Sequence, residues 1–242
     1  MVKNNVLQLS DGFTFDYDTM LGNQRLSVED VNNIQNLTEK AADAIEIMRN
    51  EGYARNHLSK DGNPEPVYFM RLPYVKKDNP NNPKSLAKLS EFSEYVKKEI
   101  DVVVFLGIGG SYLGNKMLFD IFCGETWNCL SNEERHKRPY VFFAGNNLDP
   151  LQSLNLRFLI RNIGIVGEKK GEKLKVLLVP ISKSGTTLET LTAFSYYYDK
   201  CTNSEVVETE VAVVTGLDEK TNSPIPNRTW LLKDGKATKV ID

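Results

Sequence analysis

The sequence predicts an α/β protein: a three-layer αβα sandwich built on a parallel sheet and preceded by a helical N-terminal extension. Short runs that are apolar throughout, such as residues 102–106 and 176–179, alternate with amphipathic stretches long enough to form helices. Strands of this kind are typical of a parallel sheet covered on both faces, and the alternation favours right-handed crossovers. Two of the apolar runs also end in loops rich in glycine or hydroxyl side chains, as expected where such a sheet binds a ligand.

Residues 1–60 are assigned to the N-terminal extension, which we expect to be partly helical. A helix is predicted from Ser27 to about residue 50, because apolar side chains recur at helical spacing. Ser27 is the expected N-cap, and Asp30 at the third helical position completes a capping-box pattern. Gly52 follows the periodic segment and is expected to end the helix.

Residues 61–242 are assigned to the α/β domain. A proline-rich connecting segment, residues 59–83, leads into it, and residues 68–72 are predicted to form a short strand there. The other elements follow from the apolar periodicity. Helices are predicted at residues 84–99, 112–122, 148–160 and 188–198, strands at residues 102–106, 140–144, 176–179 and 211–214, and a closing hairpin or edge pair at residues 230–232 and 237–240.

The most informative segment is Ser182-Lys183-Ser184-Gly185-Thr186-Thr187, which lies between an apolar strand and a helix. A helix start offers unpaired backbone N–H groups and the positive end of the helix dipole. The hydroxyls add hydrogen-bond donors, Gly185 allows close approach of the backbone, and Lys183 adds a positive charge. These features together predict an anion site, and a phosphate ester is the expected ligand. Thr186 is a further candidate, as an N-cap, because Thr186 and Glu189 have capping-box spacing.

A second loop of the same kind, Gly107-Ile108-Gly109-Gly110-Ser111, follows the strand at residues 102–106. The carboxyl ends of parallel strands meet at one edge of a sheet, so we expect the two loops to grip one phosphate together. Two nucleotide-binding signatures are not met. Asn115 stands where a Walker A loop needs lysine, and Tyr112 stands where the dinucleotide fingerprint needs its third glycine.

The two loops resemble those of the glucose-6-phosphate isomerase family. Residues 107–114 and 181–190 carry the resemblance in the family's order and spacing, with residues 143–147 also in the expected place. The resemblance implies a fold of two sugar-isomerase (SIS) domains, of which this chain holds the first while the C-terminal half is missing. It also implies a hexose 6-phosphate ligand and a homodimer for the full-length protein.

The implied reaction interconverts glucose 6-phosphate and fructose 6-phosphate by proton transfer through an enediol. In the family, the base glutamate, the histidine that helps to open the ring and a C-terminal lysine lie beyond Asp242, so this chain is expected to hold no catalytic residue and to be inactive alone. Glu189 is expected near the site, as a neighbour rather than the base. The residues implied to bind the phosphate are Gly110, Ser111, Ser182, Lys183, Ser184 and Thr187.

A second function stays open: a stand-alone sugar-phosphate-binding SIS module without catalysis. A catalytic role is not expected for either histidine, because His57 and His136 stand in polar or charged runs typical of surface segments.

Composition narrows the classes of partner. The net charge of −2 gives no electrostatic reason for binding nucleic acid or an anionic membrane. The three cysteines lack metal-ligand spacing and are expected to be reduced thiols, so no metal ion and no cofactor are expected. The chain shows no signal peptide and no apolar run long enough to span a membrane, and a cytoplasmic location is expected.

Overall fold

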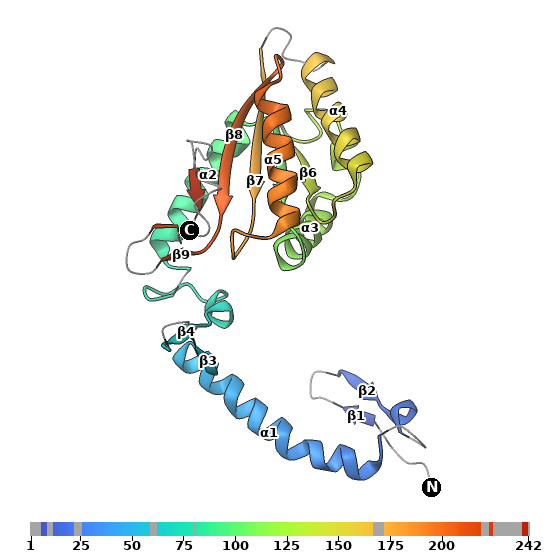
Figure 1. The fold of residues 1–242 in the computed structure, drawn as a ribbon, viewed down its shortest axis with the longest axis vertical. Helices are drawn as coiled ribbons and strands as arrows, with labels where there is room; N and C mark the ends of the chain where they lie inside the picture. The colour runs from blue at the N-terminus through green and yellow to red at the C-terminus, as the bar shows by residue number, and fades with distance from the viewer. Residues whose placement is uncertain are drawn as a thin grey trace. The chain divides into compact units, whose positions relative to one another are not determined.

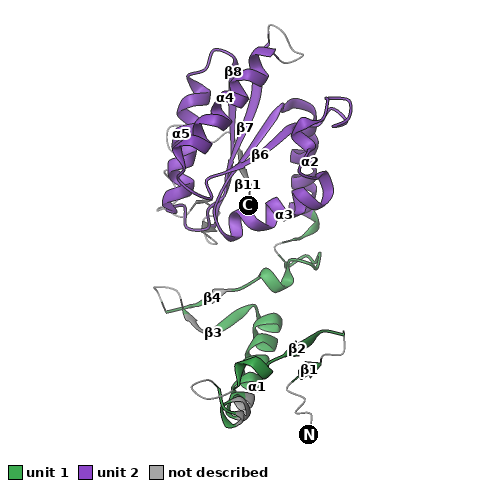
Figure 2. Ribbon diagram, turned by 90° about the vertical axis from the view of Figure 1, so that its right-hand side faces the viewer, with its two compact units in different colours: residues 1–83 green, residues 84–242 purple. Residues whose placement is uncertain are grey.

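The computed structural model describes residues 6–8, 12–21, 26–58, 62–79, 81–166, 172–218, 223–224 and 239–241. The chain divides into two compact units, residues 1–83 and residues 84–242 (Figure 2). The boundary follows Pro83, whereas the sequence analysis placed it after residue 60. The connecting segment therefore groups with the first unit.

The first unit contains the long helix α1 (Val28–Glu51), whose predicted ends are confirmed. The N–H of Asp30 donates to Ser27 Oγ at 3.0 Å, and the N–H of Ser27 donates to Asp30 Oδ2 at 2.8 Å, which completes the capping box. Gly52 ends the helix in the left-handed conformation, with φ of 81°. A side chain is rarely tolerated at this φ, which explains the glycine.

Short elements accompany α1 in the first unit. Two antiparallel pairs form, β1 (Val6–Gln8) with β2 (Thr14–Asp16) and β3 (Tyr53–Leu58) with β4 (Pro64–Pro66). Single 3-10 turns lie at Asp18–Met20 and Phe69–Arg71.

The strand predicted for residues 68–72 is wrong, because the turn at Phe69–Arg71 occupies that segment. The N–H of Arg71 donates to Tyr68 O and the N–H of Leu72 donates to Phe69 O, which is 3-10 bonding. The Arg71 guanidinium also donates to the carbonyl of Asn50 at 2.6 Å. A cation at the end of α1 is favoured by the helix dipole, and this contact joins the connecting segment to the first unit.

The second unit is an α/β sandwich with a parallel sheet, as predicted (Figure 1). The strand order is β11-β8-β7-β5-β6, and each neighbouring pair is parallel. The strands are β5 (Val102–Leu106), β6 (Tyr140–Ala144), β7 (Leu174–Pro180), β8 (Val207–Val214) and β11 (Lys239–Ile241).

Helices cover both faces of this sheet, which gives the three layers (Figure 2). On one face, α4 (Pro150–Val166) and α5 (Leu188–Thr202) cover the larger core, with Ile160, Phe194 and Tyr197 packed on the even-numbered residues of β5. On the other face, α2 (Pro83–Glu99) packs on Val103. Beside it, α3 (Gly110–Cys123) contacts Phe143 of β6 through Tyr112 and Phe119.

The C-terminal part is only partly described. β9 (Leu217–Asp218) pairs with β10 (Ser223–Pro224), and β11 adds an edge strand parallel to β8. The predicted partner segment, residues 230–232, lies outside the described residues, as do residues 237–238, so the predicted hairpin or edge pair is not tested. In the described ranges, no helix combines the length and the apolar character that crossing a bilayer requires.

Cys201 on the buried face of α5 should make the stability of the protein depend on pH. Burial raises the pKa of the Cys201 thiol to about 11, so the folded state keeps this proton where the unfolded state loses it. The free energy of unfolding should therefore fall as pH rises from about 9 to 11. Urea unfolding of Cys201→Ala should show a shallower fall than the parent chain in this window.

The matched control is Cys129→Ala, since Cys129 is exposed. The fall between about pH 9 and 11 should be shallower in Cys201→Ala than in this variant. Identical pH dependence in Cys201→Ala and the parent chain would contradict the burial argument.

Candidate functional site

The two predicted loops lie next to each other at the carboxyl edge of the sheet. β5 and β7 are adjacent and in register, with Leu106 opposite Pro180. The chain leaves β5 through α3 towards β6, but leaves β7 through α5 towards β8, on the opposite side. In open α/β sheets, ligands bind in the crevice outside the carboxyl ends of the strands at such a reversal. The N–H of Ile181 donates to Leu106 O at 2.8 Å, which continues the pairing into the loop.

The first loop has glycine where the backbone is crowded or strained. A Cβ on Gly107 would lie 2.8 Å from the carbonyl oxygen of Ser111. Gly109 adopts φ of 58° and ψ of −125°, a conformation that residues with a side chain rarely adopt. Gly109 directly precedes α3, so Gly110 and Ser111 form the first turn of that helix, Gly110 exposed and Ser111 half-buried.

The second loop folds back on itself through its hydroxyl groups. Ser182 Oγ lies 3.2 Å from Thr187 Oγ1, and Ser184 Oγ lies 3.4 Å from the same oxygen. The N–H of Gly185 donates to Ser182 Oγ at 3.0 Å. Three of the residues predicted to bind phosphate are therefore gathered at one point, where Ser182 is only 2% exposed.

The start of α5 differs from one prediction. Thr187 is the N-cap, so the prediction that Thr186 caps the helix is wrong; the Thr186 hydroxyl donates to Ser184 Oγ at 3.0 Å instead. The side chain of Thr187 makes no capping bond, because its oxygen lies within the hydroxyl cluster. The first-turn N–H groups and the positive dipole end are thus free of a side-chain cap, which suits an anion.

Charged groups beside this cluster are Lys183 and Glu189. Lys183 is exposed, and Glu189 is half-buried in the first turn of α5, where the helix dipole favours an acid. Within the described ranges, neither side chain forms an ion pair.

Sequence reasoning missed Thr215, which supports the second loop. Its buried hydroxyl donates to the carbonyl of Ser182 at 2.9 Å, while the N–H of Ser182 donates to Val214 O at 3.0 Å. Thr215 directly follows β8, and Ser182 lies just after β7. A polar residue after an apolar strand was therefore the sequence feature that could have indicated Thr215. Asn146 and Thr190 were also missed: Asn146 Oδ1 and Thr190 Oγ1 are buried and have no hydrogen-bond partner among the described residues.

The described residues offer few groups for proton transfer at this edge. His136 is exposed and precedes β6, so it lies towards the opposite edge of the sheet. The side chain of His57 lies outside the described part. Nor do the described residues include a group of three or more His, Cys, Asp or Glu side chains arranged to hold a metal ion. Glu189 is the nearest carboxylate along the chain to the hydroxyl cluster.

Similarity to known proteins supports the predicted resemblance. Curated glucose-6-phosphate isomerases from Clostridium perfringens, Pediococcus pentosaceus and Fusobacterium nucleatum are 35%, 32% and 32% identical to this chain over 113, 114 and 117 residues. These segments are 47%, 47% and 48% of this chain but only 22%, 23% and 23% of the relatives. The resemblance to this family is therefore confirmed for about half of the chain.

Two other comparisons add less. No family model matches the chain. The crystal structure of a hypothetical protein from Thermus thermophilus overlaps 66% of this chain and 32% of its own, with a TM-score of 0.40 and 20% identity. An overlap at that score carries no weight for the fold, which rests on the sheet described above.

The support that Thr215 gives to Ser182 predicts a stability change. Thr215→Val keeps the side-chain shape but leaves the buried Ser182 carbonyl without its donor, which should lower the free energy of unfolding by roughly 1–3 kcal/mol. Thr209→Val is the matched control, since Thr209 Oγ1 is buried without a partner in the described part of the chain. Denaturant unfolding should show little or no loss in the control, and equal losses in both variants would contradict this role.

Proposed function

We propose that this chain is the phosphate-binding part of a glucose-6-phosphate isomerase. The observation that carries the proposal is the meeting of two anion-type loops at one reversal point of the sheet, between β5 and β7. The similarity to enzymes named glucose-6-phosphate isomerase supports a hexose phosphate as the substrate class. The ligand is then a hexose 6-phosphate whose phosphate enters this crevice.

Each loop has a distinct role in this proposal. The hydroxyls of Ser182, Ser184 and Thr187 donate to phosphate oxygens, together with the free N–H groups at the start of α5. Lys183 supplies a positive charge. On the other side, Gly110 allows close approach and Ser111 adds a hydroxyl. Such a site binds the dianion mainly through neutral donors, so its affinity should depend on the exact placement of the loops.

In this proposal, the chain lacks two of the groups that isomerisation requires. Proton transfer between C1 and C2 needs a base beside the sugar carbons, and ring opening needs an acid–base group at the ring oxygen. We assign both groups to a further part of the full-length protein, and Glu189 to a neighbouring role. The chain alone would bind the sugar phosphate without converting it, and the full-length protein would be a homodimer.

The proposal predicts that loss of the Thr187 hydroxyl weakens binding. Hydrogen bonds to a charged group contribute roughly 1.5–3 kcal/mol, so Thr187→Ala should raise the Kd for fructose 6-phosphate about tenfold to a hundredfold. The measurement is a titration of the 242-residue chain followed by backbone amide NMR shifts. Saturable shifts are expected at residues 107–111 and 182–187 together.

The matched control is Thr192→Ala, which removes an exposed hydroxyl from the next turn of α5. Its Kd should equal that of the parent chain. A parent chain that is folded but shows no saturable shift in either loop would reject the proposed site. Conversion of fructose 6-phosphate by the chain alone would reject the division of roles but not the phosphate site.

A further inference from the structure

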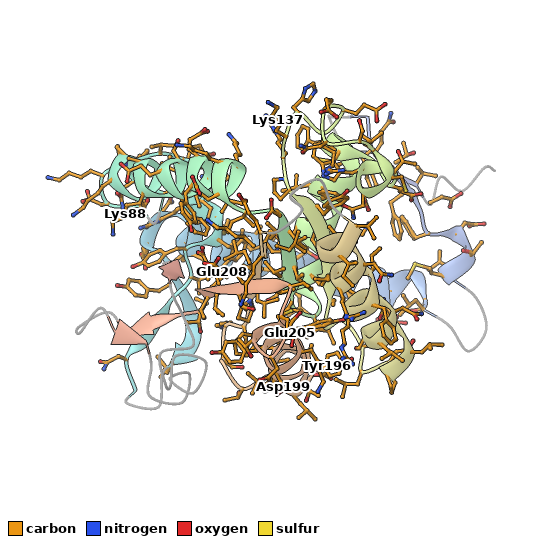
Figure 3. All side chains as sticks on the ribbon, turned by 90° about the horizontal axis from the view of Figure 1, so that it is seen from above. Lys88, Lys137, Tyr196, Asp199, Glu205 and Glu208 are labelled. Atoms are coloured by element: carbon orange, nitrogen blue, oxygen red, sulfur yellow. The ribbon has the colours of Figure 1, made fainter. Side chains whose placement is uncertain are left out.

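A separate pocket lies at the opposite edge of the sheet, where β5, β6 and β7 begin. Its volume is about 290 Å³. The walls come from Ile100 and Asp101 just before β5, the first residues of β6 and β7, the loop of residues 131–139, and the last turn of α4. Three cations line it, Arg135, Lys137 and Arg138, all within four consecutive positions of that loop. Figure 3 views the molecule from above and labels Lys137.

Arg135 is a buried cation whose recorded partners are neutral. The residue is only 3% exposed. Its Nη1 donates to the carbonyl of Leu130, its Nε donates to the carbonyl of Arg138 at 3.3 Å, and its guanidinium carbon lies 3.6 Å from the centre of the Tyr140 ring. In the described ranges it forms no ion pair with a carboxylate. Buried charges are normally paired, so this guanidinium favours an anion in the adjoining pocket.

The other two cations that line the pocket, Lys137 and Arg138, are exposed. Lys137 and Arg138 form no ion pair among the described residues. Two carboxylates, Asp101 and Glu172, line the same pocket. Asp101 Oδ2 accepts the N–H of Lys175 at 2.9 Å, which ties the start of β5 to that of β7. The cations therefore exceed the carboxylates, and one carboxylate is engaged by the sheet.

The backbone that presents these cations is strained. His136 and Lys137 are consecutive non-glycine residues in the left-handed region, with φ of 54° and 58°. The conformation is held by the N–H of His136 donating to Glu133 O at 2.9 Å and the N–H of Lys137 donating to Asn132 O at 2.8 Å. Strain of this kind persists only where the surroundings enforce it, and it is frequent at binding sites.

We propose that this pocket binds the phosphate group of a small molecule, at a site separate from the crevice between β5 and β7. A guanidinium pairs with phosphate through parallel hydrogen bonds, and lysine adds a point charge. Three cations in one turn match a doubly charged group better than a single carboxylate. The volume limits the ligand to a small metabolite or to inorganic phosphate.

The test is a titration of the 242-residue chain with inorganic phosphate at constant ionic strength, followed by backbone amide NMR. Saturable shifts are expected at residues 131–140, and they should persist in Thr187→Ala, where the crevice at the other edge is weakened. Lys137→Gln and Arg138→Gln should each raise the Kd for phosphate at this pocket about threefold to tenfold. Arg135 is left unchanged because its guanidinium also holds two backbone carbonyls.

The matched control is Lys88→Gln, since Lys88 is exposed on α2 and carries the same charge as Lys137 (Figure 3). Its Kd at the pocket should not change. The proposal is overturned if phosphate shifts only residues 107–111 and 182–187, or if the shifts at residues 131–140 do not saturate. It is also overturned if Lys88→Gln weakens binding as much as Lys137→Gln, because the response would then reflect net charge. In those cases the cations serve only to offset the negative end of the α4 dipole.

Discussion

The parallel pairing of β5 with β7 determines the geometry of the crevice at the carboxyl edge. These strands are central in the sheet, and alternate side chains on each enter different cores. Val102 and Val176 face α4 and α5, whereas Val103 and Leu177 belong to the core beneath α2. A slip of one residue would put the pleats of the two strands out of phase, so both cores oppose it. The register therefore starts both loops at the same level of the sheet.

The second loop is held by backbone groups and hydroxyls, and the described residues show no ion pair in it. Thr215 and Val214 hold the backbone of Ser182 from the next strand, and the hydroxyl cluster consumes the oxygen that would otherwise cap α5. This loop is thus stabilised by hydrogen bonds of neutral groups within the chain. Buried Thr190 in the first turn of α5 has no partner among the described residues, which places another unsatisfied hydroxyl close to that loop along the chain.

Much of this unit could be predicted from the sequence, because its central strands are apolar throughout. β5 and β6 were predicted residue for residue, and both loops were recognised from their composition. β8 was predicted too short, since its first half carries Glu208 and Glu210. The Tyr95 hydroxyl donates to Glu210 Oε1 at 2.5 Å, a contact between residues distant in the sequence that periodicity cannot reveal. The 3-10 turn at Phe69–Arg71 and the support from Thr215 depend on tertiary contacts in the same way.

β5 runs from the amino end of the parallel strands to their carboxyl end. Asp101 precedes its first residue and Gly107 follows its last. Its five residues span roughly 17 Å. The Debye length at physiological ionic strength is about 8 Å, so groups at the two ends are separated by about two screening lengths. Repulsion through solvent between anions held at the two ends is therefore small. Because of the length of this strand, a charge at one end of β5 has little effect through solvent on a charge at the other end.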